Sequence, residues 1–237
     1  MNRFFKWSMA VSVVASQILL VGCGGGSVPK DGLYMMTRYW SGSGLELDAY
    51  YFKGNQVVRS PATNIDGFDF DAARKAAPGT VGTYTRTADK MTITWGDGNK
   101  ADSTVEMKAG DPCFMWNMGS FCPVTPFPAG AKLTGTFAGG AGSSHGGNAA
   151  SNARVITFSA DGTYQMDATS TLMQENALAA ASTGQEQGTY QLNGTSLLLT
   201  PKQGAAQNLV VFPYTQNDNA PVKPDSLYFG GSMLKRR

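Results

Sequence analysis

The sequence predicts an all-β protein of two tandem antiparallel units, each a β-barrel-like or strongly curved sheet of about six strands with one short helix. The first observation is compositional. β-Branched and aromatic residues gather in short runs between turns, and glycine accounts for 29 of 237 residues. The second is that the same series of runs occurs twice along the chain. We expect unit one at residues 31–122 and unit two at residues 131–237, joined by a stiff, proline-rich linker at residues 123–130.

The duplication rests on short matches that keep their order. Gly82-Thr83-Tyr84 recurs as Gly188-Thr189-Tyr190, 106 residues later. Six ordered matches at near-constant spacing favour a repeat over chance. One larger barrel or sandwich shared by both halves is the alternative arrangement. The other five matches, at offsets between 103 and 112, are Gly32-Leu33-Tyr34 with Gly135-Thr136-Phe137, Phe52 with Phe158, Met91–Trp95 with Leu197–Thr200, Val105 with Val211, and Gly119-Ser120 with Gly231-Ser232.

Each unit is expected to open with a strand that begins Gly-x-aromatic and to continue into a hairpin. The hairpin arms are Leu45–Phe52 and Gln56–Arg59 in unit one. In unit two they are Arg154–Phe158 and Thr163–Asp167. The glycine, asparagine and aspartate residues between the arms tolerate the positive φ that tight turns require.

A connector with helical character follows the hairpin in each unit. In unit two it is Leu172–Ala181, which is rich in alanine, leucine, glutamine and glutamate, follows Ser170-Thr171 and ends near Gly184. In unit one it is the shorter segment Asp71–Ala77, ended by Pro78-Gly79. We therefore expect one short helix per unit.

Each unit then continues with the Gly-Thr-Tyr strand, two further strands and a closing apolar strand. Asp97-Gly98 and Asn193-Gly194 are expected to turn the chain between the later strands. The closing strands are Phe114–Met118 and Leu227–Phe229. The last three residues, Lys235-Arg236-Arg237, are interpreted as a solvated tail.

Residues 1–22 have the layout of a signal peptide. Arg3 and Lys6 provide a short positive start, and an apolar stretch runs from Trp7 to Val21. A transmembrane anchor is the alternative, but the stretch is short for a span of about 20 predominantly apolar residues. The segment therefore predicts export of the remaining chain.

The apolar stretch ends in Leu20-Val21-Gly22-Cys23. This tetrapeptide resembles the lipobox of bacterial lipoproteins. The resemblance implies cleavage before Cys23 and a lipid anchor on its thiol and new amino group, and two or three acyl chains hold a protein stably on a membrane. In that family Gly24, which is not aspartate, implies the outer membrane. Residues 23–30, which include a Gly-Gly-Gly-Ser run, are expected to form a flexible tether.

The layout of strands and turns in both units resembles the small lipocalin-like β-domains of bacterial lipoproteins. The motifs that carry this resemblance are phenylalanine followed by an Asp-Gly type of turn and an aromatic residue, and then Gly-Thr-Tyr. The resemblance implies a β-barrel fold. The pocket residues of lipocalins do not map onto this sequence, so none are assigned.

Charge argues against nucleic acid as a partner. Removing residues 1–22 takes away Arg3 and Lys6, which leaves 17 basic and 17 acidic side chains in a mature chain of 215 residues. A neutral chain exerts no long-range attraction on phosphate backbones. Nucleic acid is thus not expected as a partner. The expected partners are the membrane, through lipid on Cys23, and an envelope protein.

Export also places Cys113 and Cys122 where disulfides persist. Eight residues separate them, so a bridge would close a small loop and stabilise the fold by roughly 2–3 kcal/mol. A metal site is the alternative, but two thiols at this spacing and one distant histidine, His145, do not make a zinc site. We predict a disulfide, no metal and no cofactor.

No motif supplies a catalytic apparatus. His145 is the only histidine, and it lies in a glycine-rich run over residues 139–147 that is interpreted as a surface loop too mobile to orient a base. Asp66, Asp69 and Asp71 lack the spacing of an EF-hand calcium loop. They are interpreted instead as turn residues and as caps of the short helix that follows.

Methionine and aromatic side chains are further candidates for a site. Met115 and Met118 are thioethers able to hold Cu(I), but a strand over Phe114–Met118 places them on opposite faces, where they cannot share an ion. Several aromatic residues could line a pocket or a carbohydrate platform, although alternating core positions and scattered surface positions explain them as well. These residues are Tyr34, Tyr39, Trp40, Tyr50, Tyr51 and Trp95.

Three functions follow from these observations. The favoured one is a non-catalytic envelope lipoprotein whose β-units bind a protein partner. The second is a carrier of a small apolar ligand or lipid inside a barrel, which requires a dry cavity of several hundred Å³. The third, an enzyme of unrecognised type, is disfavoured because no nucleophile and base occur in a recognisable arrangement.

Overall fold

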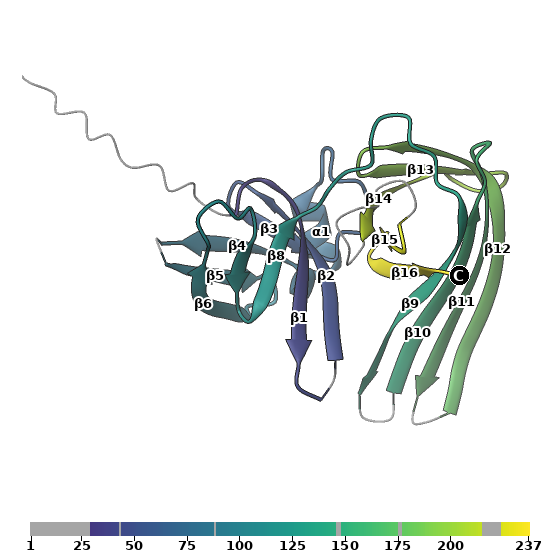
Figure 1. Ribbon diagram of the computed structural model, residues 1–237. Coiled ribbons are helices and arrows are strands. Elements are labelled where there is room, and N and C mark those ends of the chain that lie inside the picture. Colours follow the sequence, from purple (N-terminus) through teal and green to yellow (C-terminus); the bar gives the residue numbers. More distant parts are fainter. Residues whose placement is uncertain (1–28, 43, 88, 146–147, 175–176, 215–223) are drawn as a thin grey trace, which may run out of the picture.

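The computed structural model describes residues 29–42, 44–87, 89–145, 148–174, 177–214 and 224–237. The chain is all-β and forms two tandem antiparallel barrels, each closed and each built of eight strands (Figure 1). The predicted fold class is confirmed, and the alternative of one barrel shared by both halves is wrong. The expected number of about six strands per unit is too low by two.

Barrel one is an up-and-down meander that closes when β1 pairs with β8. A helix and a single 3₁₀ turn interrupt it between β3 and β4. The elements are β1 (Gly32–Trp40), β2 (Gly44–Lys53), β3 (Gln56–Arg59), α1 (Phe70–Ala76), the 3₁₀ turn η1 (Pro78–Thr80), β4 (Val81–Arg86), β5 (Lys90–Trp95), β6 (Lys100–Glu106), β7 (Phe114–Trp116) and β8 (Gly119–Pro123).

Barrel two repeats this order and closes when β16 pairs with β9. Its third and fourth strands are much longer than their counterparts in barrel one, and its first two are slightly longer. These four strands project together as a curved sheet beyond the closed part (Figure 1). The strands are β9 (Gly135–His145), β10 (Asn148–Phe158), β11 (Thr163–Gln174), β12 (Ala177–Asn193), β13 (Ser196–Pro201), β14 (Gln207–Tyr214), β15 (Ser226–Phe229) and β16 (Ser232–Arg236).

The repeated sequence matches fall on equivalent strands or on the turns that lead into them. Gly82-Thr83-Tyr84 lies on the fourth strand of barrel one, and Gly188-Thr189-Tyr190 lies on the fourth strand of barrel two. The glycine of this motif has the same steric cause in both barrels. A Cβ on Gly82 would lie 2.5 Å from the carbonyl oxygen of Thr94, and one on Gly188 would collide with the carbonyl of Thr200, the equivalent residue. The motif therefore marks a close approach between the fourth and fifth strands.

In each barrel, the strand that closes it was not predicted: β8 in barrel one and β16 in barrel two. The expected strand Phe114–Met118 ends at Trp116, because Asn117 and Met118 form a turn with φ of 48° and 61° and the chain returns as β8. In barrel two the Gly230-Gly231 turn leads into β16. Asparagine and glycine tolerate positive φ, whereas methionine does so rarely.

The expected solvated tail, Lys235-Arg236-Arg237, is wrong for the same reason. Arg236 belongs to β16, and its guanidinium donates to the carbonyls of Pro224 at 3.0 Å and Thr134 at 2.8 Å. The same group lies 4.6 Å from the centre of the Phe137 ring. These contacts tie the end of the chain to the start of barrel two.

The helix predicted in unit one is present as α1, but the helix predicted over Leu172–Ala181 is wrong. The described residues of this segment, 172–174 and 177–181, form the end of β11 and the start of β12, with Leu172 opposite Ala180. Ser170, expected to precede the helix, instead bonds Ser182 across the two strands at 2.7 Å. The intrinsic preference of such residues for a helix amounts to only about a few tenths of a kcal/mol per residue. Strand pairing in the long hairpin outweighs this preference.

The glycine-rich run that contains His145 is also not a loop, because Gly139 to His145 belong to β9 and pair with β10. Gly139 and Gly140 are required by close packing. A Cβ on Gly139 would collide with the carbonyl of Met233, and one on Gly140 with the carbonyl of Asn152. Glycine here permits close strand approach.

Apolar side chains fill the interior of each barrel. Inside barrel one, Trp116 donates its indole N–H to the carbonyl of Met91 at 2.9 Å. Barrel interiors of eight strands are just wide enough to be filled in this way. The buried side chains are Tyr34, Met36, Tyr50, Phe52, Val57, Met91, Ile93, Val105, Phe114, Trp116 and Phe121 in barrel one, and Phe127, Leu133, Phe137, Ile156, Phe158, Tyr164, Tyr190, Leu197, Leu199, Val211, Leu227, Phe229 and Leu234 in barrel two.

A third apolar cluster, here called the junction core, lies between the barrels. Its residues point outward from both barrels, alternating along the strands with residues that fill the interiors. The two barrels are thus packed against each other through a shared core. The fully buried members are Leu33, Met35, Ala49, Tyr51, Val58, Phe70 and Val81 from the first half and Val210, Phe212 and Tyr228 from the second.

Hydrogen bonds reinforce this junction. The segment that leaves β3, residues 60–69, here called the crossing segment, runs along β14 of barrel two. Thr63 forms an antiparallel bridge with Leu209, and the amide of Val210 donates to the carbonyl of Ala62 at 3.1 Å. The Tyr228 hydroxyl donates to the carbonyl of Pro61 at 3.0 Å. The crossing segment therefore binds barrel one to barrel two through its backbone.

Candidate functional site

The β1–β2 hairpin projects beyond the body of barrel one (Figure 1). Its tip carries exposed apolar side chains. Tyr39 is 76% exposed, Leu45 is 48% exposed and Trp40 is 39% exposed. The register pairs Tyr39 with Leu45 across the hairpin. Large apolar side chains gathered at one exposed tip indicate a contact surface more strongly than single scattered ones do.

The Trp40 side chain is held in place by charged neighbours. Its indole N–H donates to Glu46 Oε2 at 2.7 Å, and the guanidinium carbon of Arg38 lies 5.4 Å from the centre of its ring. Arg38 Nη1 also pairs with Glu46 Oε2 at 3.4 Å. The indole is thus fixed before any partner arrives, which lowers the entropic cost of binding.

A ladder of charges continues from the tip towards the crossing segment. Arg59 Nη2 pairs with Glu46 at 3.3 Å, and Arg59 Nε donates to Asp48 at 2.5 Å. Asp48 is buried, at 7% exposure, and also accepts hydrogen bonds from the Ser60 hydroxyl at 2.5 Å and the Ala49 amide at 2.8 Å. The buried carboxylate is therefore both paired and hydrogen-bonded, as buried charges require.

Burial also perturbs the phenol beside this ladder. Tyr50 lies inside barrel one, where loss of solvent raises the pKa of its hydroxyl to about 12. Arg59 opposes this shift and Asp48 adds to it, both to a smaller extent. The phenol therefore stays neutral at physiological pH.

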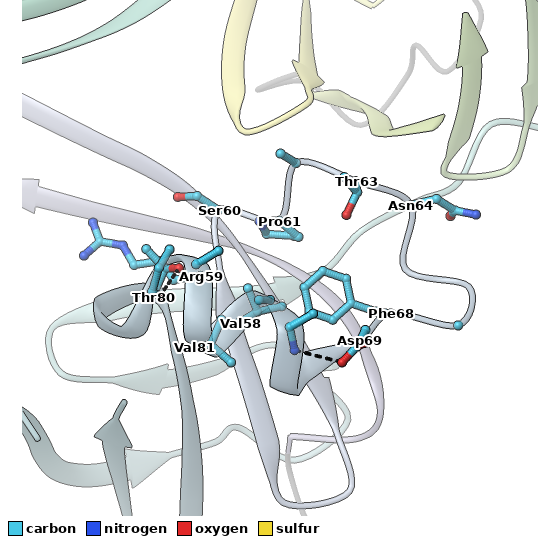
Figure 2. A pocket seen from close by; sticks show the side chains of 16 residues that line it. Val58, Arg59, Ser60, Pro61, Thr63, Asn64, Phe68, Asp69, Thr80 and Val81 are labelled. Carbon is cyan, nitrogen blue, oxygen red and sulfur yellow. Dashed lines mark hydrogen bonds between the residues drawn. The ribbon is translucent and has the colours of Figure 1, made fainter. Parts of the chain in front are cut away.

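A groove of about 660 Å³ lies on the outside of barrel one, beyond the Arg59 end of the ladder (Figure 2). Its walls are β3, the crossing segment and α1, together with Thr80 and Val81 at the start of β4. Alanines of α1 and Val58, Pro61 and Phe68 make the lining largely apolar. The polar groups on its edge are Arg59, Ser60, Thr63, Asn64, Asp69 and Thr80.

The groove owes its shape to the local sequence around α1. Asp69 caps the helix by accepting hydrogen bonds from the amides of Asp71 at 3.0 Å and Ala72 at 2.9 Å. Small alanine side chains on the helix leave space between it and the crossing segment. The cap and the alanines together keep the helix close to β3 without filling the groove.

Ser60 contributes a hydroxyl to the groove, next to the buried carboxylate of Asp48. Ser60 has a left-handed backbone, with φ of 52°, and its hydroxyl donates to Asp48. The Asp48 carboxylate also accepts hydrogen bonds from the Arg59 guanidinium and the Ala49 amide, so both of its oxygens are already engaged. Activation of a serine needs a base able to take its proton.

The site residues suggested by the sequence are spread over the fold. Cys23 lies outside the described residues. Cys113 and Cys122 are joined in the predicted disulfide, next to the Phe114–Phe121 pair of β7 and β8. The disulfide belongs to barrel one, where Cys113 directly precedes β7 and Cys122 lies on β8, and neither strand lines the groove.

The three aspartates around α1 act as turn and cap residues. Asp69 caps the helix, Asp71 pairs with Arg74 at 2.9 Å, and Asp66 accepts a bond from the Asn64 side chain at 3.4 Å. Among the described residues, no group of three histidine, cysteine or acidic side chains is placed to hold a metal ion. The predicted role of these aspartates in capping is confirmed for Asp69.

The methionines that were considered and rejected as copper ligands, Met115 and Met118, do not share a strand. Met115 belongs to β7 and Met118 lies in the turn that follows, and both side chains are exposed. The argument from opposite strand faces therefore does not apply to them.

Sequence reasoning listed Tyr39 and Trp40 but did not separate them from the core aromatics. Tyr34 and Tyr50 fill barrel one, and Tyr51 belongs to the junction core. The signal that could have separated these two residues from the core aromatics was their position directly before Ser-Gly-Ser-Gly. A glycine- and serine-rich sequence of this kind is typical of a turn, and strand residues next to a turn are often exposed. The groove gave no signal, because its lining residues come from segments brought together by the fold.

Comparison of the chain with protein-family models, with curated proteins and with solved structures finds no match. In the described part of the chain, no helix has the length and apolar character needed to cross a lipid bilayer. The functional argument therefore rests on the geometry of the hairpin tip and the groove.

Proposed function

We propose that this protein is a lipid-anchored envelope lipoprotein that binds a protein partner through the β1–β2 hairpin tip and has no catalytic role. The observation that carries the proposal is the indole of Trp40, fixed by Arg38 and Glu46, with Tyr39 exposed on the other face of the same tip. Tryptophan, tyrosine and arginine are the residues most enriched at the energetic centres of protein interfaces. A tip of this composition, already rigid, suits a small and specific contact.

The direction of β1 supports a partner rather than the membrane as the occupant of the tip. The proposed tether, residues 23–30, leads into β1 at Gly32, and Trp40 is at the other end of that strand. At about 3.3 Å per residue, the strand separates the two points by roughly 27 Å. The tip therefore extends away from the point where the anchored chain enters the barrel.

The proposed attachment follows from the lipobox Leu20-Val21-Gly22-Cys23 and places the protein in the bacterial envelope, at the outer membrane. Replacement of Cys23 by alanine is expected to abolish labelling with radioactive palmitate and to leave an uncleaved precursor. Continued labelling of the Cys23→Ala variant would rule out the assignment. Binding through the hairpin tip is tested separately, since it does not depend on the lipid.

The partner proposal is tested with purified, detergent-solubilised protein used to capture envelope proteins. The affinity of Trp40→Ala for the captured partner is expected to fall at least tenfold, because loss of a central aromatic anchor costs about 2 kcal/mol or more of binding free energy. Met118→Ala is the matched control, since Met118 is also exposed at a hairpin turn of barrel one. Equal capture by wild type and Trp40→Ala, or no reproducible partner, would contradict the proposal.

A second candidate function is the binding of a small apolar ligand, and the groove favours it. Its volume of about 660 Å³ falls in the range of ligand pockets, roughly 300–1,000 Å³. The filled barrel interiors argue against a ligand inside either barrel. The fluorescent fatty-acid analogue cis-parinaric acid is expected to bind the wild-type protein. Its affinity for Ala76→Trp is expected to be lower, because Ala76 is an exposed helix residue in the lining and a larger side chain there would fill the groove. Unchanged binding by Ala76→Trp would exclude the groove as the ligand site.

A further inference from the structure

The first four strands of barrel two extend past the strands that should flank them. On one side, β16 pairs with β9 only from Phe137 to Gly139. On the other side, β13 pairs with β12 only from Gly188 to Asn193. Beyond these points β9–β12 continue as a four-stranded projection (Figure 1), and no described strand pairs with its outer edges. The edges are the β9 edge, residues 140–145, and the β12 edge, residues 177–187.

Backbone hydrogen bonds show which groups face the β12 edge. The Tyr190 amide donates to Gly162, which precedes β11, at 2.8 Å, whereas the Gln187 carbonyl accepts from Lys202, which follows β13, at 2.8 Å. Successive residues of a strand direct their backbone groups to opposite sides. The β11–β12 register stays regular from Thr189 back to Ala181. The amides and carbonyls of Thr183 and Gln185 therefore face the open edge.

The same reasoning applies to the β9 edge. The Thr136 carbonyl accepts from the Arg237 amide at 2.9 Å, so even-numbered residues of β9 direct their backbone groups towards the β16 side. The β9–β10 register is regular as far as the pairing of His145 with Asn148. The backbone groups of Gly140, Gly142 and Ser144 consequently face outward beyond the end of β16.

From Ala180 to Glu186 the β12 edge lacks the usual protection against strand pairing, and the one bulge in its register with β11 lies farther out, at Ala179. Natural edge strands carry lysine, proline, bulges or inward charges that block a further strand. Residues 177–187 contain no lysine, arginine or proline, and their one charged side chain, Glu186, accepts a hydrogen bond from the Tyr164 hydroxyl. The residues from Ala180 to Gln185 are all exposed. At about 3.3 Å per residue, the regular part of the open edge, from Ala180 to Glu186, is roughly 23 Å long.

The projection also lacks an apolar face that would stabilise it alone. Asp167 and Thr169 on one face and Ser170 and Ser182 on the other are exposed. Small sheets persist in water when an apolar face packs on another layer. Pairing of the edges is the remaining source of stability that this backbone offers.

The two edges complement each other. The four strands alternate in direction, so β9 and β12 run antiparallel to one another. If a second copy is placed beside the first in the same orientation, the β9 edge of that copy lies antiparallel to the β12 edge of the first. The pairing continues the existing antiparallel order without reversing either molecule.

We propose that β12 of one copy pairs with β9 of the next, so that the projections join into one continuous antiparallel sheet. The contact is heterologous, and repeated rotation about an axis along the strands closes it into a ring. All copies in such a ring direct their amino-terminal ends to the same side. This inference does not depend on the hairpin tip or on the groove.

The test uses the full, lipidated chain in detergent and measures assembly by light scattering over a range of concentrations. Thr183→Pro removes an amide that faces the open edge and keeps the pairing with β11, so it is expected to weaken assembly about tenfold or more. Thr183→Ala keeps the amide and is expected to assemble as wild type does. Gln185→Pro repeats the test at the next outward-facing position, with circular dichroism confirming that each variant is folded.

Cross-linking identifies the strands in contact. Chains with Thr183→Cys are mixed with chains carrying Ser144→Cys and treated with a short bis-maleimide, and mixed dimers are expected to exceed dimers of either variant alone. Dimers formed by Thr183→Cys alone would show β12–β12 pairing and overturn the proposed contact. A wild-type protein that stays monomeric at all concentrations, or a folded Thr183→Pro variant that assembles normally, would overturn it as well.

Discussion

Replacing Phe212 with alanine should separate the unfolding of the two barrels. Phe212 is 1% exposed, points outward from β14, and stacks on Tyr228 with ring centres 4.7 Å apart and planes 8° apart. It belongs to the junction core and not to the interior of barrel two. Its removal should therefore weaken the contact between the barrels more than either barrel itself.

The expected magnitude follows from burial. Loss of a fully buried phenylalanine side chain removes about 2–3 kcal/mol of transfer free energy. The cavity left behind raises the cost to about 3–5 kcal/mol. Small domains are stable by only about 5–15 kcal/mol, so this loss is large enough to uncouple two barrels that the junction core and the hydrogen bonds of the crossing segment hold together.

The assay uses urea unfolding followed by two probes. The tryptophans of the described residues are Trp40, Trp95 and Trp116, and all of them lie in barrel one, so indole fluorescence reports on that barrel. Far-ultraviolet circular dichroism reports on both barrels. The two curves are expected to coincide for wild type and to separate for Phe212→Ala.

Phe229→Ala is the matched control for this experiment. Phe229 is also fully buried, but it points into barrel two. Its loss should lower the common midpoint and leave the two curves coincident, because the junction core stays intact. Coincident curves for Phe212→Ala, or a loss below about 1 kcal/mol, would refute a junction that couples the barrels.

Three further predictions concern barrel one. Gly82→Ala should cost about 1–3 kcal/mol by overpacking, because its Cβ would lie 2.5 Å from the Thr94 carbonyl. Gly184→Ala is the control, since nothing lies within 4 Å of a Cβ there; equal urea midpoints for the two variants would contradict the steric explanation. Replacing Cys113 and Cys122 with serine should lower stability by roughly 2–3 kcal/mol, and an unchanged midpoint would mean that the bridge adds nothing. Tyr50, whose pKa is raised by burial from 10.0 to about 12, keeps its proton in the folded state after the unfolded state has lost it. Stability should therefore fall by about 1.4 kcal/mol per pH unit from this group as the pH rises from 10 towards 12. Tyr50→Phe should show a shallower fall in alkaline urea titrations, and a slope equal to that of wild type would refute the assignment.

The sequence predicted the closed regions of the fold better than the projecting ones. The Gly-Thr-Tyr repeat, the turn residues between short apolar runs and the pairing of Cys113 with Cys122 depend on contacts close in the sequence or on steric limits at a single glycine. Such features leave local patterns. The continuous apolar runs around Tyr34 and Tyr51 also carried a signal, because both of their faces are buried. That signal indicates that further residues cover the outer face of these strands, but it does not identify the covering residues as those of barrel two.

By itself the sequence determined the class of the fold, its duplication, the short helix after Asp69 and the disulfide, because alternation, turns and caps are local. Only the tertiary structure decided the rest. Closure depends on the pairing of β8 with β1 and of β16 with β9, and these partners lie far apart in the sequence. The described residues of 172–181 form strands because strand pairing outweighed helix propensity. The docking of the barrels, the groove and the free edges arise from residues distant in sequence, so no local pattern could specify them.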